Sequence, residues 1–217
     1  VPPSFRIIRQ LLDRIEDAAT GAIKLDALHA DIPRERIAQA RAAAVILGPS
    51  VTEQFPWFGN TEPMDADRTE CLLNRSWRPT LTIVGADGLP QVGNAGNVLR
   101  ASTTLKLSIR TPPTVDTDIA IEALHKTLTE NPPHGAHITL NLSGANGWEA
   151  PMIRPWLHAA INEASSDWFN APAMYRGEGF SIPFMAMLGQ AFPRAQFVIT
   201  GVLGPGSNAH GPNEFLH

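Results

Sequence analysis

The last third of the chain contains two strand–loop–helix motifs, and two strands are too few for a stable parallel sheet. The first motif has a short strand near 173–176, then a Gly-rich loop and an apolar helix over 184–192. The second has an apolar strand over 196–203, a Gly-rich loop and the start of a helix at 213–216. Strands that alternate with helices are typical of a parallel α/β sheet. The sequence therefore predicts an incomplete part of a larger α/β domain.

The first 148 residues show a different pattern, in which amphipathic helices and alternating strands are interleaved. Helices with polar N-cap residues are predicted over 4–18 with Ser4, over 31–47 with Asp31, and after Asp116. Alternation of apolar and polar residues predicts strands over 80–84, 97–110 and 136–142. Residues 49–76 have weak periodicity and are interpreted as an irregular excursion.

The stretch 143–151 is rich in glycine and turn-forming residues, which makes it the best candidate for a domain boundary. We therefore expect one domain over 1–148 and another over 149–217. The first is predicted to be an α+β layer, an antiparallel sheet covered by helices. The second is predicted to be a partial α/β domain.

Composition excludes several classes of protein. The chain has 217 residues, a net charge of −4 and no run of Lys or Arg, so nucleic acid is not an expected partner. No apolar run reaches the roughly 18 residues of a membrane span, so no membrane association is expected. The single cysteine, Cys71, excludes an internal disulfide framework and predicts a cytoplasmic location.

Residues that could carry chemistry are scattered along the chain: Asn97, Arg110, Glu178, Ser181 and His210. Arg110 ends a polar strand face, where a solvated charge is the alternative. Glu178 lies between two glycines, and Ser181 could simply cap a helix. His210 lies on the loop after the last predicted strand, and open α/β sheets bind ligands outside the carboxyl ends of their strands. A histidine there can bind a metal, transfer protons or have no special role.

Three segments in this order resemble one family. Residues 97–110 run from Asn-Val-Leu-Arg to a terminal arginine, 176–183 read Arg-Gly-Glu-Gly-Phe-Ser-Ile-Pro, and 204–214 read Gly-Pro-Gly-Ser-Asn-Ala-His-Gly-Pro-Asn-Glu. Together they resemble the C-terminal half of the zinc-dependent aminoacylase, carnosine dipeptidase and carboxypeptidase G family of metallopeptidases. The resemblance covers essentially the whole chain. It implies that 1–148 are a lid that also forms a homodimer, and that 149–217 are the C-terminal portion of the catalytic domain.

The resemblance also implies roles for individual residues. Arg110 would bind the C-terminal carboxylate of a small peptide or an N-acyl amino acid, and Ser181 and backbone N–H groups near Gly179 would assist. Glu178 would lie near the amino end of the substrate. The family more often has glycine where this chain has Phe180, which weakens the assignment of Ser181.

Two further residues gain roles in the same way. His210 would coordinate one of two zinc ions. Asn97 would polarise the carbonyl of the bond to be cleaved, from the same subunit or from the partner subunit.

The family's other metal ligands and its general base belong to an N-terminal half that this sequence does not contain. A catalytic zinc needs about three protein ligands, and only one is identified here. We therefore expect a dipeptidase-like enzyme as the full-length protein, with no catalytic residue in this chain and no activity from this chain alone.

Two other classes of function remain open at this point. Residues 1–148 could be a non-catalytic α+β module for dimerisation or small-ligand binding. The 204–211 loop could bind an anion at a helix N-terminus, although neither Lys nor Arg flanks it.

Overall fold

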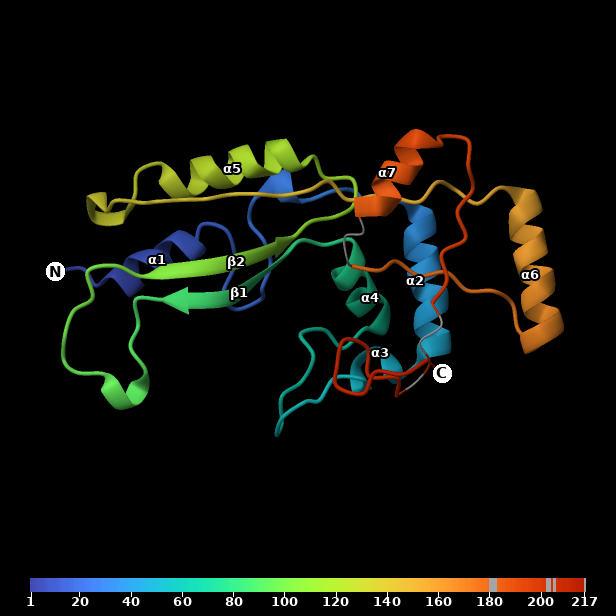
Figure 1. The fold of residues 1–217 in the computed structure, drawn as a ribbon, viewed down its shortest axis with the longest axis horizontal. Helices are drawn as coiled ribbons and strands as arrows, with labels where there is room; N and C mark the ends of the chain where they lie inside the picture. The colour runs from blue at the N-terminus through green and yellow to red at the C-terminus, as the bar shows by residue number, and fades with distance from the viewer. Residues whose placement is uncertain (180–182, 202–203, 205, 217) are drawn as a thin grey trace. The chain divides into compact units, whose positions relative to one another are not determined.

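The computed structural model describes residues 1–179, 183–201, 204 and 206–216 (Figure 1). The described chain forms two units. The first unit comprises Val1–Glu149 and Ala173–Leu188, and the second comprises Ala150–Pro172 and Gly189–His217. An antiparallel sheet with surrounding helices confirms the predicted α+β class.

The sheet of the first unit consists, in the described residues, of β1 (Thr80–Asp87) and β2 (Thr104–Arg110). The strands are antiparallel, with Thr80 opposite Arg110 and Asp87 opposite Thr104. An irregularity between Ile83 and Gly85 shifts the register by one residue, which allows β1 to continue past its predicted end at Val84. The long strand predicted over 97–110 forms only from Thr104, because the residues before it belong to the connection between the strands.

Residues 136–142 are extended and alternate between half-buried and exposed positions, as the sequence predicts. Ile138, Leu140 and Leu142 pack against the first hydrophobic core. No ladder of backbone hydrogen bonds joins this segment to a neighbour in the described part of the chain. The prediction of a strand is therefore right about the face that is buried and wrong about pairing.

Helix α1 (Ser4–Leu12) is shorter than the predicted helix over 4–18. Pro3 occupies the N-cap position, and the Ser4 hydroxyl is hydrogen-bonded to that of Thr103 at 2.8 Å, so the prediction of Ser4 as the cap is wrong. The chain turns after Asp13. Ile15 is fully buried although it lies beyond the end of the helix.

A helical segment over residues 34–76 follows the short 3-10 helix η1 (Asp26–Leu28). Helix α2 (Arg34–Leu47) has Pro33 at its N-cap, so Asp31 does not cap it, and it ends at Gly48, whose φ of 53° is in the left-handed region.

The irregular excursion predicted over 49–76 is wrong for two segments, which form α3 (Ser50–Glu53) and α4 (Arg68–Ser76). Asp67 begins α4 by accepting hydrogen bonds from the backbone N–H groups of Thr69 at 2.7 Å and Glu70 at 3.3 Å. These bonds lower the pKa of the Asp67 carboxyl group.

The first unit contains two separate hydrophobic cores. One lies between α1, η1, the sheet and α5 (Thr117–Thr129), and its buried members are Leu11, Ile15, Ile23, Leu28, Val115, Ala120, Leu124 and Leu128. The other holds α2, α3 and α4 together, and its buried members are Ala40, Ala43, Ala44, Val51, Leu72, Leu73 and Trp77. The helical segment therefore has a core of its own beside the sheet layer.

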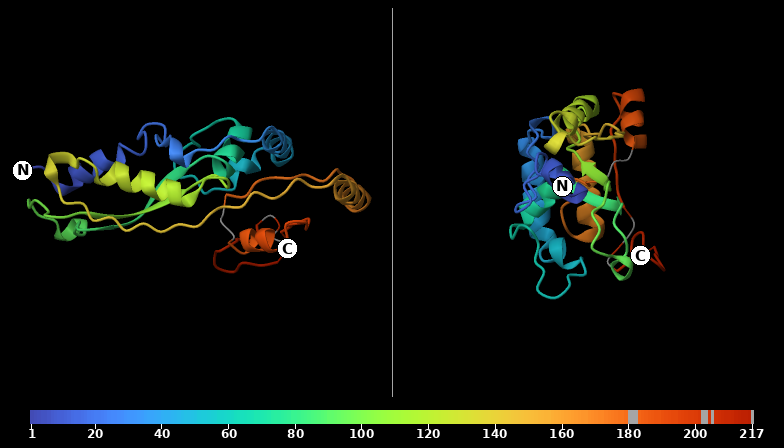
Figure 2. Two further views of the ribbon diagram at one scale, coloured as in Figure 1. Left: turned by 90° about the horizontal axis from the view of Figure 1, so that it is seen from above. Right: turned by 90° about the vertical axis from the view of Figure 1, so that its left-hand side faces the viewer.

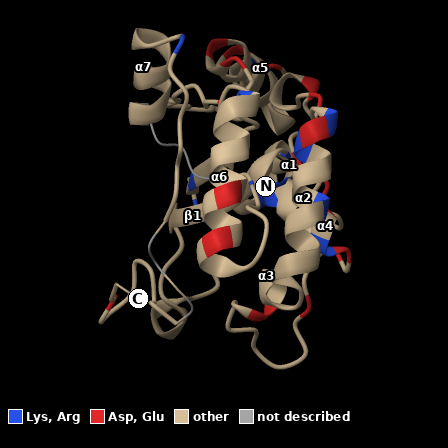
Figure 3. Ribbon diagram, turned by 90° about the vertical axis from the view of Figure 1, so that its right-hand side faces the viewer, with Lys and Arg blue, Asp and Glu red and all other residues tan. Residues whose placement is uncertain are grey.

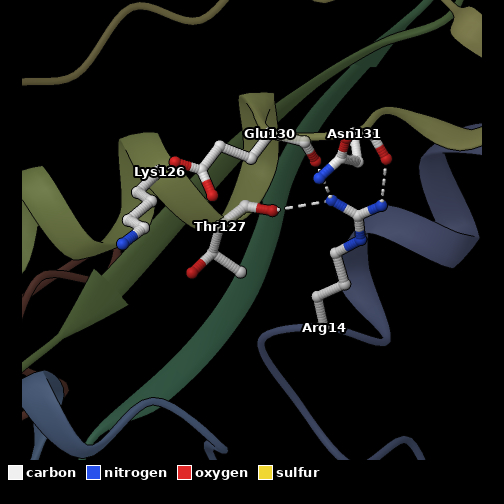
Figure 4. A pocket seen from close by; sticks show the side chains of 5 residues that line it. All are labelled: Arg14, Lys126, Thr127, Glu130 and Asn131. Carbon is white, nitrogen blue, oxygen red and sulfur yellow. Dashed lines mark hydrogen bonds between the residues drawn. The ribbon is translucent and has the colours of Figure 1, made fainter.

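Helix α5 (Thr117–Thr129) lies along the β1–β2 hairpin (Figures 1 and 2). Its N-terminus is capped as predicted, because the Asp116 carboxylate accepts from the N–H groups of Asp118 at 2.9 Å and Ile119 at 3.2 Å. Its C-terminus is capped from the turn after α1: the Arg14 guanidinium donates to the carbonyl oxygens of Thr127, Glu130 and Asn131 (Figure 4). A positive charge at a helix C-terminus is favourable. The pocket that Arg14 lines with residues at the end of α5 therefore has a structural role.

Replacing Asp116 by alanine is expected to lower the free energy of unfolding by about 1 kcal/mol, because two N–H groups of α5 lose their acceptor. Asp116→Asn is the matched control, since its amide oxygen can still accept and it should retain most of the stability. Urea unfolding of this chain followed by circular dichroism measures both. An equal loss for the two variants would show that charge matters here and capping does not.

Two more 3-10 helices interrupt the connections of the first unit, η2 (Val92–Asn94) before β2 and η3 (Pro133–Gly135) after α5. Helix α7 (Pro183–Ala191) is close to the helix predicted over 184–192 and spans the division between the units. It contains no charged residue, whereas α2 carries charges of both signs (Figure 3).

The second unit contains α6 (Pro155–Phe169), close to the predicted helix that follows 151. The strands predicted near 173–176 and over 196–203, and the helix predicted at 213–216, do not form in the described residues of those segments. Among its described residues no apolar side chain is buried, and Trp156, Trp168 and Phe169 are 64%, 84% and 79% exposed. The second unit therefore lacks a hydrophobic core in its described part.

Candidate substrate site

The first candidate residue, Arg110, is the last residue of β2. Its guanidinium group is exposed, and its Nη1 donates a hydrogen bond of 2.9 Å to the backbone carbonyl oxygen of Gly179. These residues are 69 positions apart in the sequence. The end of β2 thus meets the segment that carries Glu178 and Gly179, so the structure brings these three predicted site residues together.

The segment before Gly179 carries charges of both signs. Arg176 and Glu178 form an ion pair in which both side chains are 45% exposed. Tyr175, next in sequence, is half-buried, and burial raises the pKa of its hydroxyl group. Arg110, which contacts Gly179, and Arg176, which pairs with Glu178, bring two guanidinium groups to this segment. Guanidinium groups suit a ligand with a carboxylate group.

Two glycines of this segment pack tightly against the C-terminal turn of α4. A Cβ atom at Gly177 would lie 2.8 Å from the Cβ of Ser76, and a Cβ at Gly179 would overlap the carbonyl oxygen of Arg75. Arg75, Ser76 and Arg176 are not among the site residues predicted from the sequence. The signal that could have located α4 is Asp67 with Glu70 three residues later, which is a helix-start pattern.

Asn97 is exposed and lies in the connection between the strands, which joins Asp87 to Thr104. Arg110 lies at the other end of the hairpin, opposite Thr80. Seven extended residues span roughly 20 Å. The structure therefore does not bring Asn97 together with Arg110 within one chain.

Ser181 and Phe180 lie outside the described residues. His210 belongs to the second unit, so its position relative to Arg110 is not described. Residues 208–214 are closed into a loop by their own hydrogen bonds: Asn208 Nδ2 donates to the Pro212 carbonyl at 2.6 Å, and the His210 N–H donates to the Glu214 carboxylate at 2.7 Å.

His210 is exposed and has a φ of 61°, which is uncommon for a residue with a side chain. Such backbone conformations persist only where surrounding bonds enforce them, and they are concentrated at functional sites. The Glu214 hydrogen bond is one such enforcing interaction, and the sequence-based reasoning did not assign it.

The described residues do not form a zinc centre by themselves. They contain no group of three or more His, Cys, Asp or Glu side chains arranged to hold a metal ion. A catalytic zinc takes about three protein ligands, and His210 can supply one. Any metal bound through His210 therefore requires ligands from outside the described part of this chain.

Solved structures with the same fold cover nearly the whole chain. The M20 family metallo-carboxypeptidase Sso-CP2 from Sulfolobus solfataricus aligns over 99% of this chain with a TM-score of 0.68 and 16% identity. The di-peptidase Dug1p from Saccharomyces cerevisiae aligns over 100% with a TM-score of 0.67 and 21% identity. Human carnosine dipeptidase 1 aligns over 90% with a TM-score of 0.64 and 18% identity.

The chain has the M20 metallopeptidase fold. The resemblance predicted from the sequence is therefore confirmed. One curated relative agrees with it: the cysteinylglycine-S-conjugate dipeptidase of Corynebacterium striatum is 25% identical over 138 residues, which is 63% of this chain. No protein-family model matches the sequence.

The chain spans less than half the length of these matched proteins. It covers 48%, 45% and 42% of the three solved structures and 30% of the curated relative. In the described residues no helix is long and apolar enough to cross a membrane.

Proposed function

We propose that this chain provides the lid and the C-terminal part of the catalytic domain of a zinc metallopeptidase. The enzyme would hydrolyse dipeptides, N-acyl amino acids or related compounds at an amide bond next to a free carboxylate. Residues 1–148 would form the lid and 149–217 the catalytic part. The single observation that carries the proposal is the contact between Arg110 and the carbonyl of Gly179, beside Glu178.

The chemistry of these residues fits such a substrate. A guanidinium group binds a carboxylate through two parallel hydrogen bonds, which fixes the orientation of the ligand as well as its charge. Arg110 would bind the substrate carboxylate, with assistance from Ser181 and from backbone N–H groups near Gly179. Glu178 would lie close to the substrate's amino end, where a carboxylate favours an ammonium group.

The second unit supports the proposal that the full-length protein contains a further catalytic half. None of its described apolar side chains is buried, and a unit without a buried core does not compensate the entropy lost on folding. The matched structures are about twice as long as this chain. We propose that the remaining catalytic half covers these side chains and supplies the metal ligands that His210 lacks. A native gene product of about twice 23.5 kDa, found by intact mass, is expected.

We also propose a homodimer formed through the lid. Within one chain Asn97 is separated from Arg110 by the length of β2. An Asn97 that polarises the substrate carbonyl would therefore act in the site of the partner subunit. Sedimentation of the protein at micromolar concentration tests this, and a monomer would contradict it. A cytoplasmic location stays a prediction from the single cysteine.

The chain alone, supplied with zinc, is expected to show no sustained hydrolysis of dipeptides that a chelator abolishes, because His210 is one ligand of the three that a catalytic zinc needs. The control is the longer polypeptide, which carries this sequence together with the N-terminal half that the resemblance implies. That protein is expected to hydrolyse dipeptides and to lose activity with a chelator. Chelator-sensitive hydrolysis by the chain alone would contradict the proposal.

A further inference from the structure

The 177–179 segment packs against the C-terminal turn of α4 without room for a side chain. A Cβ at Gly179 would overlap the carbonyl oxygen of Arg75, and one at Gly177 would lie 2.8 Å from the Cβ and 3.1 Å from the Oγ of Ser76. Neither glycine has a positive φ. A side chain is therefore excluded by the space that α4 occupies and not by the backbone conformation.

The turn that these glycines touch is itself held in position. Leu72 and Leu73 are 5% and 2% exposed in the second core, and Trp77, directly after the helix, is 5% exposed. The Ser76 hydroxyl donates to the carbonyl of Leu72 at 2.7 Å. Side chains in such cores do not shift freely, because interiors are close-packed.

The position of Gly179, limited by its contact with α4, also limits the position of Arg110. The Gly179 carbonyl oxygen accepts the hydrogen bond from Arg110 Nη1 at 2.9 Å. A backbone carbonyl that moves takes its donor with it or loses the bond. A misplacement of about 1 Å in a binding group can reduce an enzyme's rate roughly 100-fold.

We infer that the C-terminal turn of α4, at Arg75 and Ser76, positions the 177–179 segment and through it Arg110. Arg75 and Ser76 are positioning residues in this assignment. The inference rests on the proposed function, in which Arg110 binds the substrate carboxylate. It gives the helical segment 34–76 a role in the site, since that segment's core fixes the surface against which the two glycines pack.

The test is a mutant cycle at positions 76 and 177 in the longer polypeptide. Gly177→Ala is expected to raise KM for a dipeptide about tenfold with a smaller change in kcat, because the displaced segment shifts the guanidinium group that binds the ground state. Adding Ser76→Gly removes both atoms that the new methyl group meets, and is expected to restore KM to within about threefold of the Ser76→Gly single variant.

Ser76→Ala is the matched control, because it keeps the Cβ at 2.8 Å and removes only the hydroxyl group. The Ser76→Ala, Gly177→Ala protein is expected to keep the raised KM. A dipeptide with an amidated C-terminus, which lacks the carboxylate, is expected to show no KM change in any of these variants. Independent effects of the two positions, or an equal KM change for the amidated substrate, would overturn the inference.

Urea unfolding of the same proteins separates this inference from the proposed function. A longer polypeptide that hydrolyses no dipeptide would overturn the proposed function. The packing of α4 on the segment would then be judged by stability alone. Coupled losses at 76 and 177 that Ser76→Gly relieves would support it, and additive losses would overturn it.

Discussion

Replacing Arg110 by alanine is expected to lower kcat/KM of the longer polypeptide for dipeptides roughly 100-fold, which corresponds to about 3 kcal/mol. The reason is that a charge-assisted, two-point hydrogen bond to the substrate carboxylate is lost. The measurement is steady-state hydrolysis of a dipeptide and of the same dipeptide with an amidated C-terminus. The amidated substrate offers no carboxylate, so the variant and the unmodified protein should hydrolyse it equally.

Two further variants sharpen this experiment. Arg110→Lys keeps the charge but not the planar fork, and an intermediate loss is expected. Arg6→Ala removes an exposed arginine from α1 and should leave kcat/KM unchanged. If Arg110→Ala reduced hydrolysis of both substrates to the same extent, Arg110 would support the structure of the site and would not bind the carboxylate.

Replacing Ile15 by alanine is expected to lower the free energy of unfolding by about 2–4 kcal/mol, because a buried side chain loses its transfer free energy and leaves a cavity. Ile15 is 0% exposed in the core between α1, η1, the sheet and α5. Urea unfolding of this chain followed by circular dichroism measures the loss.

The matched control is Ile119→Ala, the same change at a residue of α5 that is 58% exposed. A loss below about 1 kcal/mol is expected there. Similar losses at the two positions would mean either that Ile15 does not lie in a close-packed core or that another surface covers Ile119.

Local signals in the sequence predicted part of this fold correctly. Asp116 was predicted as a cap because an N-cap depends only on a side chain and N–H groups two and three residues later. The half-buried face of 136–142 follows in the same way from alternation along an extended segment. The same kind of signal, Asp67 before Glu70, marks α4, although it was not used in the prediction.

Local signals predicted the structure wrongly where contacts with other segments determine it. The apolar period of α1 continues to Ile15, yet the helix ends at Leu12 and Ile15 reaches the core from a turn. Residues 136–142 have a strand pattern, but pairing needs a neighbour with unsatisfied backbone groups at the right distance. A pattern within one segment contains no information about that neighbour.

The α+β class, the resemblance to M20-type metallopeptidases and the residue types of the candidate site can all be predicted from the sequence. Those follow from periodicity and from short motifs whose residues are close together in the chain. Only the tertiary structure decided that Arg110 meets Gly179, that α4 lies directly behind the two glycines and that Asn97 lies at the far end of the hairpin. The physical reason is that these relations join segments many residues apart, and packing of the two cores fixes them.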